Sequence, residues 1–247
     1  MAEKLVYFLS DAHLGSRAIG DPRAHERKLV SFLDSIKDKA AAIYLLGDMF
    51  DFWFEYRTVV PKGHVRFLGK IAEMADSGVE VHFFTGNHDM WTFGYLADEL
   101  GINVHTKPME KEILGKRFFL AHGDGLNDNK LSVRIIQSIF HSKTLQFLFK
   151  MLPPYIGLNF GYTWSKSNRN KHDNEDCEYM GEDKEPLVLF AKKHALKHDV
   201  DFYLFGHRHI LLDLPMERSR VVILGDWFRE FSYATFNGSE FLIHHYE

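Results

Sequence analysis

Short apolar runs alternate with stretches of helical periodicity along the first half of the chain. Such runs, rich in β-branched and aromatic residues, predict strands at Leu5–Leu9, Ile43–Leu46 and Val79–Thr85. Apolar residues at helical spacing predict helices at about Ala24–Lys37, His64–Ser77 and Tyr95–Leu100. Met109–Leu114 and Arg117–Ala121 flank Gly115-Lys116, which is typical of a β-hairpin. This alternation predicts a layered α/β core.

The pattern changes in residues 126–185. Leu131–Leu152 has apolar residues at helical spacing with basic residues between them, and Pro153-Pro154 is expected to stop that helix. An aromatic segment and then a polar stretch follow, before a helix over Pro186–Lys197, a strand over Asp201–Phe205 and further strands over Ile210–Tyr246. We therefore expect one domain, residues 1–247, with a helical cap inserted at 126–185. The alternative is a helical hairpin that packs only on its own domain.

Length, charge and cysteine content narrow the class of protein. The 247 residues suit one domain, and the net charge of −4 provides no basic field for nucleic acid, so none is expected as a partner. The only cysteine, Cys177, cannot form an intrachain disulfide, which favours a reducing compartment and predicts a cytoplasmic protein. No apolar run reaches the length of a membrane span, and the N-terminal apolar run predicts a strand rather than a signal peptide.

Candidate metal ligands follow five of the predicted strands. The clusters are Asp11-Ala12-His13, Gly47-Asp48, Gly86-Asn87-His88-Asp89, His122-Gly123-Asp124 and Gly206-His207-Arg208-His209. Strand ends are where an α/β fold presents its chemistry, so the five clusters are expected to converge. Oxygen donors mixed with imidazole suit Mn, Fe, Zn or Co, whereas a lone histidine is more often a structural polar residue. The histidines outside these motifs are given that structural interpretation.

The five motifs, in this order, resemble those of the calcineurin-like metallophosphoesterases. The resemblance covers nearly the whole chain and implies a four-layer α-β-β-α sandwich with two divalent metal ions, expected to be Mn²⁺. It assigns Asp11, His13 and His209 to one ion, Asn87, His122 and His207 to the other, and Asp48 to a bridge between them. It also implies a hydroxide shared by the ions that attacks phosphorus.

The same resemblance makes His88 a catalytic residue that is not a ligand, acting either as a general acid or as a phosphate contact. Asp89 is expected to orient an imidazole from behind, and Asp51 and Asp124 are further candidates for such support. For Asp89 and Asp124, plain turn capping is the alternative.

Two local features favour a particular phosphoester. Gly47-Asp48-Met49-Phe50-Asp51-Phe52-Trp53 resembles the corresponding segment of the UDP-2,3-diacylglucosamine diphosphatases, in which a tryptophan lies beside the metal centre. That family splits an acylated UDP-sugar into UMP and 2,3-diacylglucosamine 1-phosphate in lipid A biosynthesis. Its best-known branch has G-N-R-D where this chain has Gly86-Asn87-His88-Asp89.

The second feature is the apolar cap, which offers more aromatic and aliphatic surface than a connecting loop needs and suits acyl chains. The expected substrate contacts are Asn87, His88, Trp53, Ser165, Lys166, Arg169 and Lys171. For the polar run that begins at Ser165, a solvated surface is the alternative. A lipid-binding cap also predicts contact with a membrane surface, at the cytoplasmic face of the inner membrane, without spanning it.

Two other functions compete with this interpretation. A phosphoesterase for a soluble nucleotide or phosphoprotein would need no apolar trough. A non-catalytic binding protein on the same fold is disfavoured, because all seven ligand positions and His88 are present. The oligomeric state and the acyl-chain length are left open by the sequence.

Overall fold

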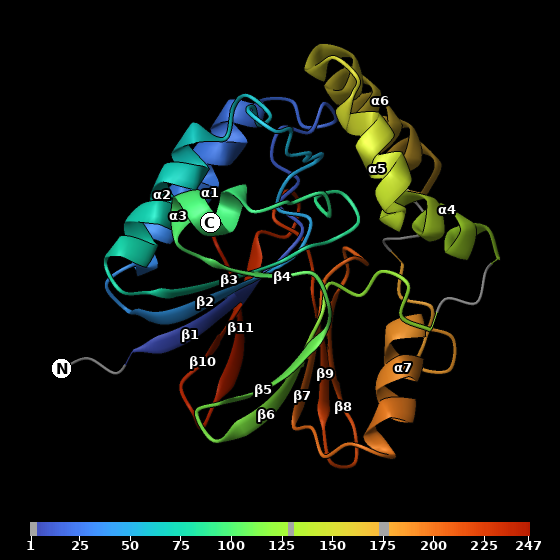
Figure 1. Ribbon diagram of the computed structural model, residues 1–247. Coiled ribbons are helices and arrows are strands. Elements are labelled where there is room, and N and C mark those ends of the chain that lie inside the picture. The colour runs from blue at the N-terminus through green and yellow to red at the C-terminus, as the bar shows by residue number, and fades with distance from the viewer. Residues whose placement is uncertain (1–3, 128–130, 173–177) are drawn as a thin grey trace.

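The computed structural model describes residues 4–127, 131–172 and 178–247; the side chains of residues 131–134, 137 and 167–172 are outside that description. Two β-sheets pack face to face between layers of helices (Figure 1). The six-stranded sheet has the order β11 (Phe241–His245), β10 (Ser232–Phe236), β1 (Leu5–Leu9), β2 (Ala40–Leu46), β3 (Glu80–Phe84) and β4 (Asn103–His105). The five-stranded sheet has the order β5 (Met109–Ile113), β6 (Lys116–Leu120), β7 (Phe202–Phe205), β9 (Arg220–Leu224) and β8 (Leu211–Pro215).

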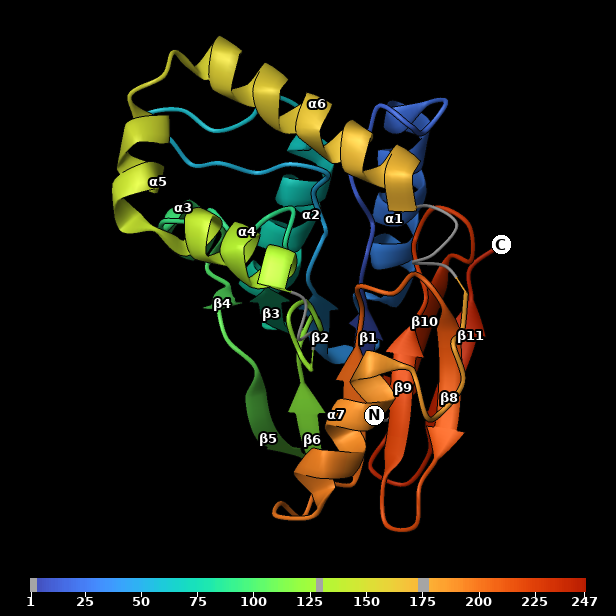
Figure 2. The ribbon, with the colours of Figure 1, turned by 90° about the vertical axis from the view of Figure 1, so that its right-hand side faces the viewer.

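Helices cover the outer face of each sheet. The helices α1 (Pro22–Ile36), α2 (Val65–Asp76) and α3 (Tyr95–Leu100) pack on the six-stranded sheet, and α7 (Pro186–Ala195) lies across the outer face of the five-stranded sheet (Figure 2). Between the sheets, Phe8 of β1 stacks on Phe118 of β6 with ring centroids 5.6 Å apart. The four-layer α-β-β-α expectation is therefore confirmed.

Parallel pairing sets the direction of the strands that matter for function. In one sheet β1, β2 and β3 are parallel neighbours, and in the other β6, β7 and β9 are. Their buried faces are nearly continuous runs of apolar side chains, as is usual for parallel strands covered on both sides. The carboxyl ends of both parallel sets point toward the same end of the molecule (Figure 2).

Three helices form the insertion after β6: α4 (Leu131–His141), α5 (Lys143–Lys150) and α6 (Pro154–His172). They group at the opposite end of the molecule from the β5–β6 turn in both ribbon views (Figures 1 and 2). The single helix expected over Leu131–Leu152 was wrong, because the chain breaks at Ser142. The Ser142 hydroxyl accepts a hydrogen bond from the Leu145 backbone N–H at 3.4 Å, which caps α5. Pro154 begins α6, a position that suits the fixed φ of proline.

The insertion docks on the segments that follow β2 and β3. Phe149 of α5 lies 4.7 Å from Phe54 and 5.5 Å from Trp91, measured between ring centroids. Two glycines of α6 allow the closest approach, since a Cβ atom on Gly157 would lie 2.1 Å from the Tyr56 hydroxyl, and one on Gly161 would lie 2.3 Å from the Phe52 ring. The expected cap limits, 126 and 185, stay a prediction.

Replacing Gly161 with alanine is expected to lower the free energy of unfolding by about 1–3 kcal/mol, because the added methyl group overlaps the buried Phe52 ring. Gly69, inside α2, is the matched control because it has open space around it. Gly69→Ala is expected to raise stability by about 0.5–1 kcal/mol through helix propensity. Urea unfolding of both variants measures the two changes, and equal effects of the same sign would contradict the tight docking of α6.

Candidate metal centre

The five motifs meet at the carboxyl ends of the strands. Asp11 and His13 follow β1, Asp48 follows β2, and Asn87 and His88 follow β3. From the second sheet, His122 follows β6, and His207 and His209 follow β7. Four of these eight residues are buried, with Asp11 and His13 fully so, and the other four are half-buried. The sandwich therefore gathers residues that lie up to 198 positions apart in the sequence, from 11 to 209.

The first group consists of Asp11, His13 and His209. Their ligand atoms all lie within 4.8 Å of one another. His13 Nε2 and His209 Nε2 are 3.1 Å apart, and His209 Nε2 is 3.2 Å from Asp11 Oδ1. Two imidazole nitrogens and a carboxylate oxygen that face each other at these distances fit a shared divalent cation.

The second group consists of Asp48, His122 and His207, whose ligand atoms also lie within 4.8 Å of one another. His122 Nε2 lies 3.2 Å from Asp48 Oδ2 and 3.3 Å from Asn87 Oδ1. The same Asp48 oxygen is 3.9 Å from His13 Nε2 of the first group. Asp48 thus lies between the two groups, as the bridging role requires.

The backbone of these loops is in an uncommon conformation. Nine non-glycine residues of the described chain have positive φ, and five of them are Asp11, His13, Asp48, His207 and His209. A non-glycine residue in the left-handed region costs on the order of 1–3 kcal/mol and is uncommon, so it persists where the surroundings enforce it. Five of the predicted ligands therefore have strained backbone. The sequence pattern did not predict this strain.

Hydrogen bonds fix which imidazole nitrogen faces the centre. His122 Nδ1 donates to the Leu46 carbonyl oxygen at 2.8 Å, which leaves Nε2 toward Asp48. His88 Nδ1 donates to the Asp51 carbonyl oxygen at 2.8 Å, and its ring lies edge-on to that of His13 at 4.8 Å. A backbone carbonyl thus holds Nδ1 of each ring, and Nε2 of each ring faces the centre.

For Asp89, the contacts correspond to the capping alternative rather than to the orientation of an imidazole. Its carboxylate accepts hydrogen bonds from backbone N–H groups, at 2.7 Å from Gly86, 2.8 Å from Met49, and 3.3 Å from both Asp48 and Phe50. These contacts tie the loop after β3 to the loop after β2, so the carboxylate orients two backbones rather than an imidazole.

The ionisable groups of the centre shift one another's pKa values. Burial acts to raise the pKa of Asp11, but hydrogen bonds from His13 and His209 hold that pKa well below its usual range. For His122, burial acts to lower the pKa, yet the adjacent Asp48 carboxylate raises it well above the ordinary value. The centre therefore holds ionised carboxylates that strongly favour positive charge beside them, whether a proton or a metal ion.

A sixth strand end completes the centre and was not identified from the sequence. After β9, the Trp227 backbone N–H donates to the Asp11 carbonyl oxygen at 3.0 Å, and the Phe228 ring lies 5.9 Å from His13 and 5.4 Å from His209. The Asp226 carboxylate caps this turn through backbone N–H groups of the residues that follow. The apolar strand followed by Gly225-Asp226 resembled the other motifs and was the available signal.

The remaining expected substrate contacts differ in how exposed they are. Trp53 is fully buried and donates from Nε1 to Glu55 Oε1 at 3.1 Å, so its placement offers no exposed surface to a substrate. Ser165 is buried in α6, and Lys166 is exposed. The side chains of Arg169 and Lys171 lie outside the described residues. Their predicted roles stay predictions.

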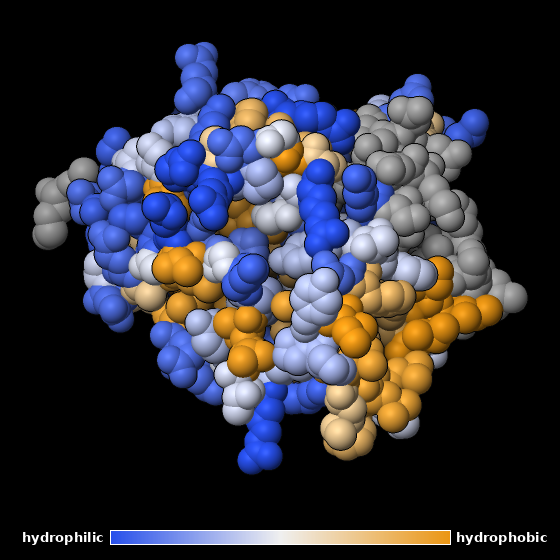
Figure 3. Space-filling model, turned by 90° about the horizontal axis from the view of Figure 1, so that it is seen from above, coloured by the Kyte–Doolittle hydropathy of each residue, from blue (hydrophilic) through white to orange (hydrophobic). Residues whose placement is uncertain are grey.

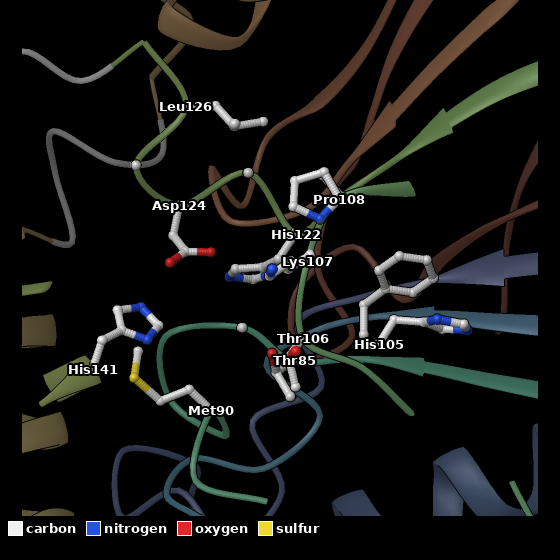
Figure 4. Close-up of a pocket in the computed structure, with 15 residues that line it drawn as sticks. Thr85, Met90, His105, Thr106, Lys107, Pro108, His122, Asp124, Leu126 and His141 are labelled. Carbon is white, nitrogen blue, oxygen red and sulfur yellow. The ribbon is translucent and has the colours of Figure 1, made fainter. Parts of the chain in front are cut away.

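A cavity of about 230 Å³ opens directly beside His122 (Figure 4). Its wall combines the loops after β3 and β6 with the segment before β5 and the end of α4, and includes Thr85, Lys107, Asp124 and His141. The close-up shows Asp124 and His141 on the side toward the insertion and Lys107 near His122. The cavity thus joins the metal centre to the base of the insertion.

The chain is similar to a protein family, to curated proteins and to solved structures. The family described as calcineurin-like phosphoesterase matches residues 4–211. A UDP-2,3-diacylglucosamine hydrolase of Porphyromonas gingivalis is 44% identical over 252 residues, covering 96% of each chain. A protein of the same description from Escherichia coli O139:H28 is 26% identical, covering 97% of this chain and 98% of its own. A solved archaeal phosphodiesterase has a TM-score of 0.47 and 13% identity, covering 97% of this chain and 98% of that one.

Proposed function

The chain belongs to the calcineurin-like phosphoesterase family, and we propose that it hydrolyses the pyrophosphate bond of UDP-2,3-diacylglucosamine to UMP and 2,3-diacylglucosamine 1-phosphate. The observation that carries this proposal is the 44% identity to a UDP-2,3-diacylglucosamine hydrolase along nearly the whole of both chains, insertion included. The family and the named relatives make the chain a metal-dependent hydrolase.

The donor set fits two divalent ions. Asp11, His13 and His209 would hold one, Asn87, His122 and His207 the other, and Asp48 both, and we propose Mn²⁺ because mixed oxygen and imidazole donors suit it. Such a pair supplies an activated water and neutralises charge on the phosphoryl oxygens. The protein itself contributes the fixed spacing of the ligands, which the strained loops and the Asp89 contacts maintain.

His88 is proposed to act on the leaving group. Its Nδ1 is occupied by the Asp51 carbonyl oxygen, and its backbone N–H donates to Asp48 Oδ1 at 2.8 Å, so the residue is anchored at two points. The half-buried ring then presents Nε2 beside the first group of ligands. At that position it would protonate the departing phosphate oxygen or contact it as a hydrogen-bond donor.

The insertion is proposed to bind the acyl chains. Its helices expose large apolar side chains, and Figure 3 shows hydrophobic residues gathered on the side of the molecule where the insertion lies. They are Ile135, Ile136, Ile139, Leu145, Phe147, Leu148, Met151, Leu152, Tyr155, Ile156, Phe160 and Trp164. An apolar surface of this extent is unusual unless something covers it, and each CH₂ removed from water contributes about 0.8 kcal/mol.

The polar part of the substrate is proposed to meet α6. The hydroxyl of Ser165 is buried and has no hydrogen-bond partner among the described residues. A buried hydroxyl without a partner costs on the order of 1–3 kcal/mol, which a sugar or phosphate oxygen would relieve. Lys166 beside it is exposed, and Arg169 and Lys171 continue the same helix, so they are proposed to contact the phosphates.

We also propose that the exposed apolar side of the insertion rests on the cytoplasmic face of the membrane that holds the substrate. Within the described residues, no helix has both the length and the apolar character needed to cross a bilayer.

A product assay tests the reaction. Purified protein with Mn²⁺ is expected to release UMP from UDP-2,3-diacylglucosamine, and excess EDTA is expected to abolish that release because the phosphoryl charge is no longer neutralised. Bis-p-nitrophenyl phosphate serves as a generic diester in parallel. Turnover of the generic diester without UMP release would keep the metal chemistry and overturn the substrate.

The double substitution Phe147→Ser and Leu148→Ser is expected to raise KM for the diacylated substrate by about 10-fold or more and leave turnover of a short soluble diester unchanged. Both side chains are more than half exposed, at 62% and 56%, so their replacement should not disturb the core. Phe149 is unsuitable for this test because it packs on Phe54 and Trp91. Leu196→Ser, equally apolar but outside the insertion, is the control, and an unchanged KM in the double variant would exclude this surface as the acyl site.

A further inference from the structure

A further cluster of potential metal ligands lies outside the metal centre. Glu110 lies on β5, His194 lies in the last turn of α7, and His198 follows that helix. We propose that Glu110, His194 and His198 form a separate zinc-binding site between the edge of the five-stranded sheet and the end of α7.

The distances suit one tetrahedral ion. One donor atom from each residue lies within 4.8 Å of the other two. His194 Nε2 is 3.6 Å and His198 Nδ1 is 2.7 Å from the same oxygen, Glu110 Oε1. Ligand atoms at zinc–nitrogen and zinc–oxygen distances of about 2.0–2.2 Å in a tetrahedron are roughly 3.3 Å apart, so the observed separations bracket the required value.

Neighbouring groups already orient each ligand. His194 Nδ1 and the Tyr203 hydroxyl are 3.1 Å apart, and Tyr203 is itself buried, which directs His194 Nε2 toward Glu110. The other Glu110 oxygen is 3.4 Å from an Arg117 guanidinium nitrogen, and this contact leaves Oε1 for the histidines. The rings of His194 and His198 are stacked with centroids 3.8 Å apart. The three donors are thus held before any ion arrives.

The site is also accessible. The exposed fractions of the side chains are 17% for His194, 29% for Glu110 and 44% for His198. Three protein ligands with an open side are the usual arrangement for a zinc ion that keeps a water in its fourth position. Two imidazoles with a single carboxylate are a donor set that zinc accepts, and the general order of affinities of divalent metals places zinc above manganese at such a set.

An ion here would act on the active centre only through α7. It would fasten the carboxyl end of that helix to β5. At the other end, Glu185 directly precedes α7 and binds Arg208, which lies between the proposed ligands His207 and His209. Zinc at this site is therefore expected to stabilise the fold, while the chemistry stays with the centre.

Zinc counting tests the proposal. Full-length protein is saturated with zinc, freed of unbound metal by gel filtration, and analysed for zinc per chain and for thermal stability. His198→Ala and Glu110→Gln are each expected to hold one zinc fewer per chain than the parent and to lose part of its zinc-dependent rise in Tm. Zinc bound at the metal centre contributes equally to the zinc content of parent and variants, because none of the centre's residues is changed.

The control is His245→Ala, which removes an exposed histidine 3.9 Å from the carboxylate of Glu230, a pair with no third ligand in the described chain. It is expected to match the parent in zinc content. Mn²⁺-supported activity is expected to be unchanged in His198→Ala, which verifies that the variant is folded. Equal zinc content in the parent and both site variants would overturn the proposal, as would an equal loss in the His245→Ala control.

Discussion

Replacing Asp48 with asparagine is expected to lower UMP release from UDP-2,3-diacylglucosamine by more than about 100-fold, because changing even an outer partner of a metal ligand costs about 10–100-fold. Asp48 Oδ2 faces His122 at 3.2 Å and His13 at 3.9 Å, so one carboxylate oxygen lies beside both groups. An amide nitrogen in its place cannot bind a cation. The Asp48 oxygen that accepts the His88 backbone N–H is preserved by the amide oxygen, so the loop is expected to remain folded.

The measurement combines turnover with bound metal. Asp48→Asn is expected to hold fewer ions per chain than the parent and to unfold at a similar urea concentration. Asp213→Asn, which changes an exposed carboxylate paired with Arg220, is the control and is expected to retain parental activity. Near-parental turnover in Asp48→Asn would contradict the bridging role of that carboxylate.

The second large effect concerns stability. Glu185→Gln is expected to lower the free energy of unfolding by about 3–5 kcal/mol, because it removes the buried carboxylate that pairs with the Arg208 guanidinium. Glu185 is fully buried and accepts a hydrogen bond from Arg208 Nε at 2.9 Å, and Arg208 also donates to the Glu178 carbonyl oxygen at 3.0 Å. Since Arg208 lies between His207 and His209, turnover is expected to fall as well.

Glu182→Gln is the matched control, because its carboxylate pairs with Lys192 at the surface, where such pairs contribute about 0–1 kcal/mol. Chemical unfolding of both variants measures the difference. The double variant Glu185→Leu with Arg208→Met removes both charges of the pair and replaces them with apolar side chains. It is expected to recover much of the stability that Glu185→Gln loses. Equal stability of the two single variants would show that the buried pair does not hold this loop.

The sequence alone determined the layered core and the identity of the candidate ligands. Strand and helix patterns are local, since their periods of two and 3.6 residues can be read within one short window. The strands before Asp11, Asp48 and His122 were recognised in this way, and their ends gave the ligands. The family resemblance then supplied the pairing of ligands, which no periodicity contains.

Only the tertiary structure decided how those ligands are held. The left-handed backbone at Asp11 and Asp48, the Asp89 contacts to two loops and the Phe228 ring against His13 each require chain segments that are distant in sequence. The break of the expected long helix at Ser142 likewise depends on the Ser142 cap of α5 and on the packing of α5 against Phe54 and Trp91.

The physical reason is the range of the forces involved. Hydrophobic periodicity reports which face of an element is buried, but not which partner covers it, because burial of apolar surface is not directional. Hydrogen bonds, ligand spacing and close glycine contacts such as Gly161 on Phe52 are directional and short-ranged, and they exist only after the two sheets and α6 have packed. The sequence therefore determined which residues carry the chemistry, and packing determined their geometry.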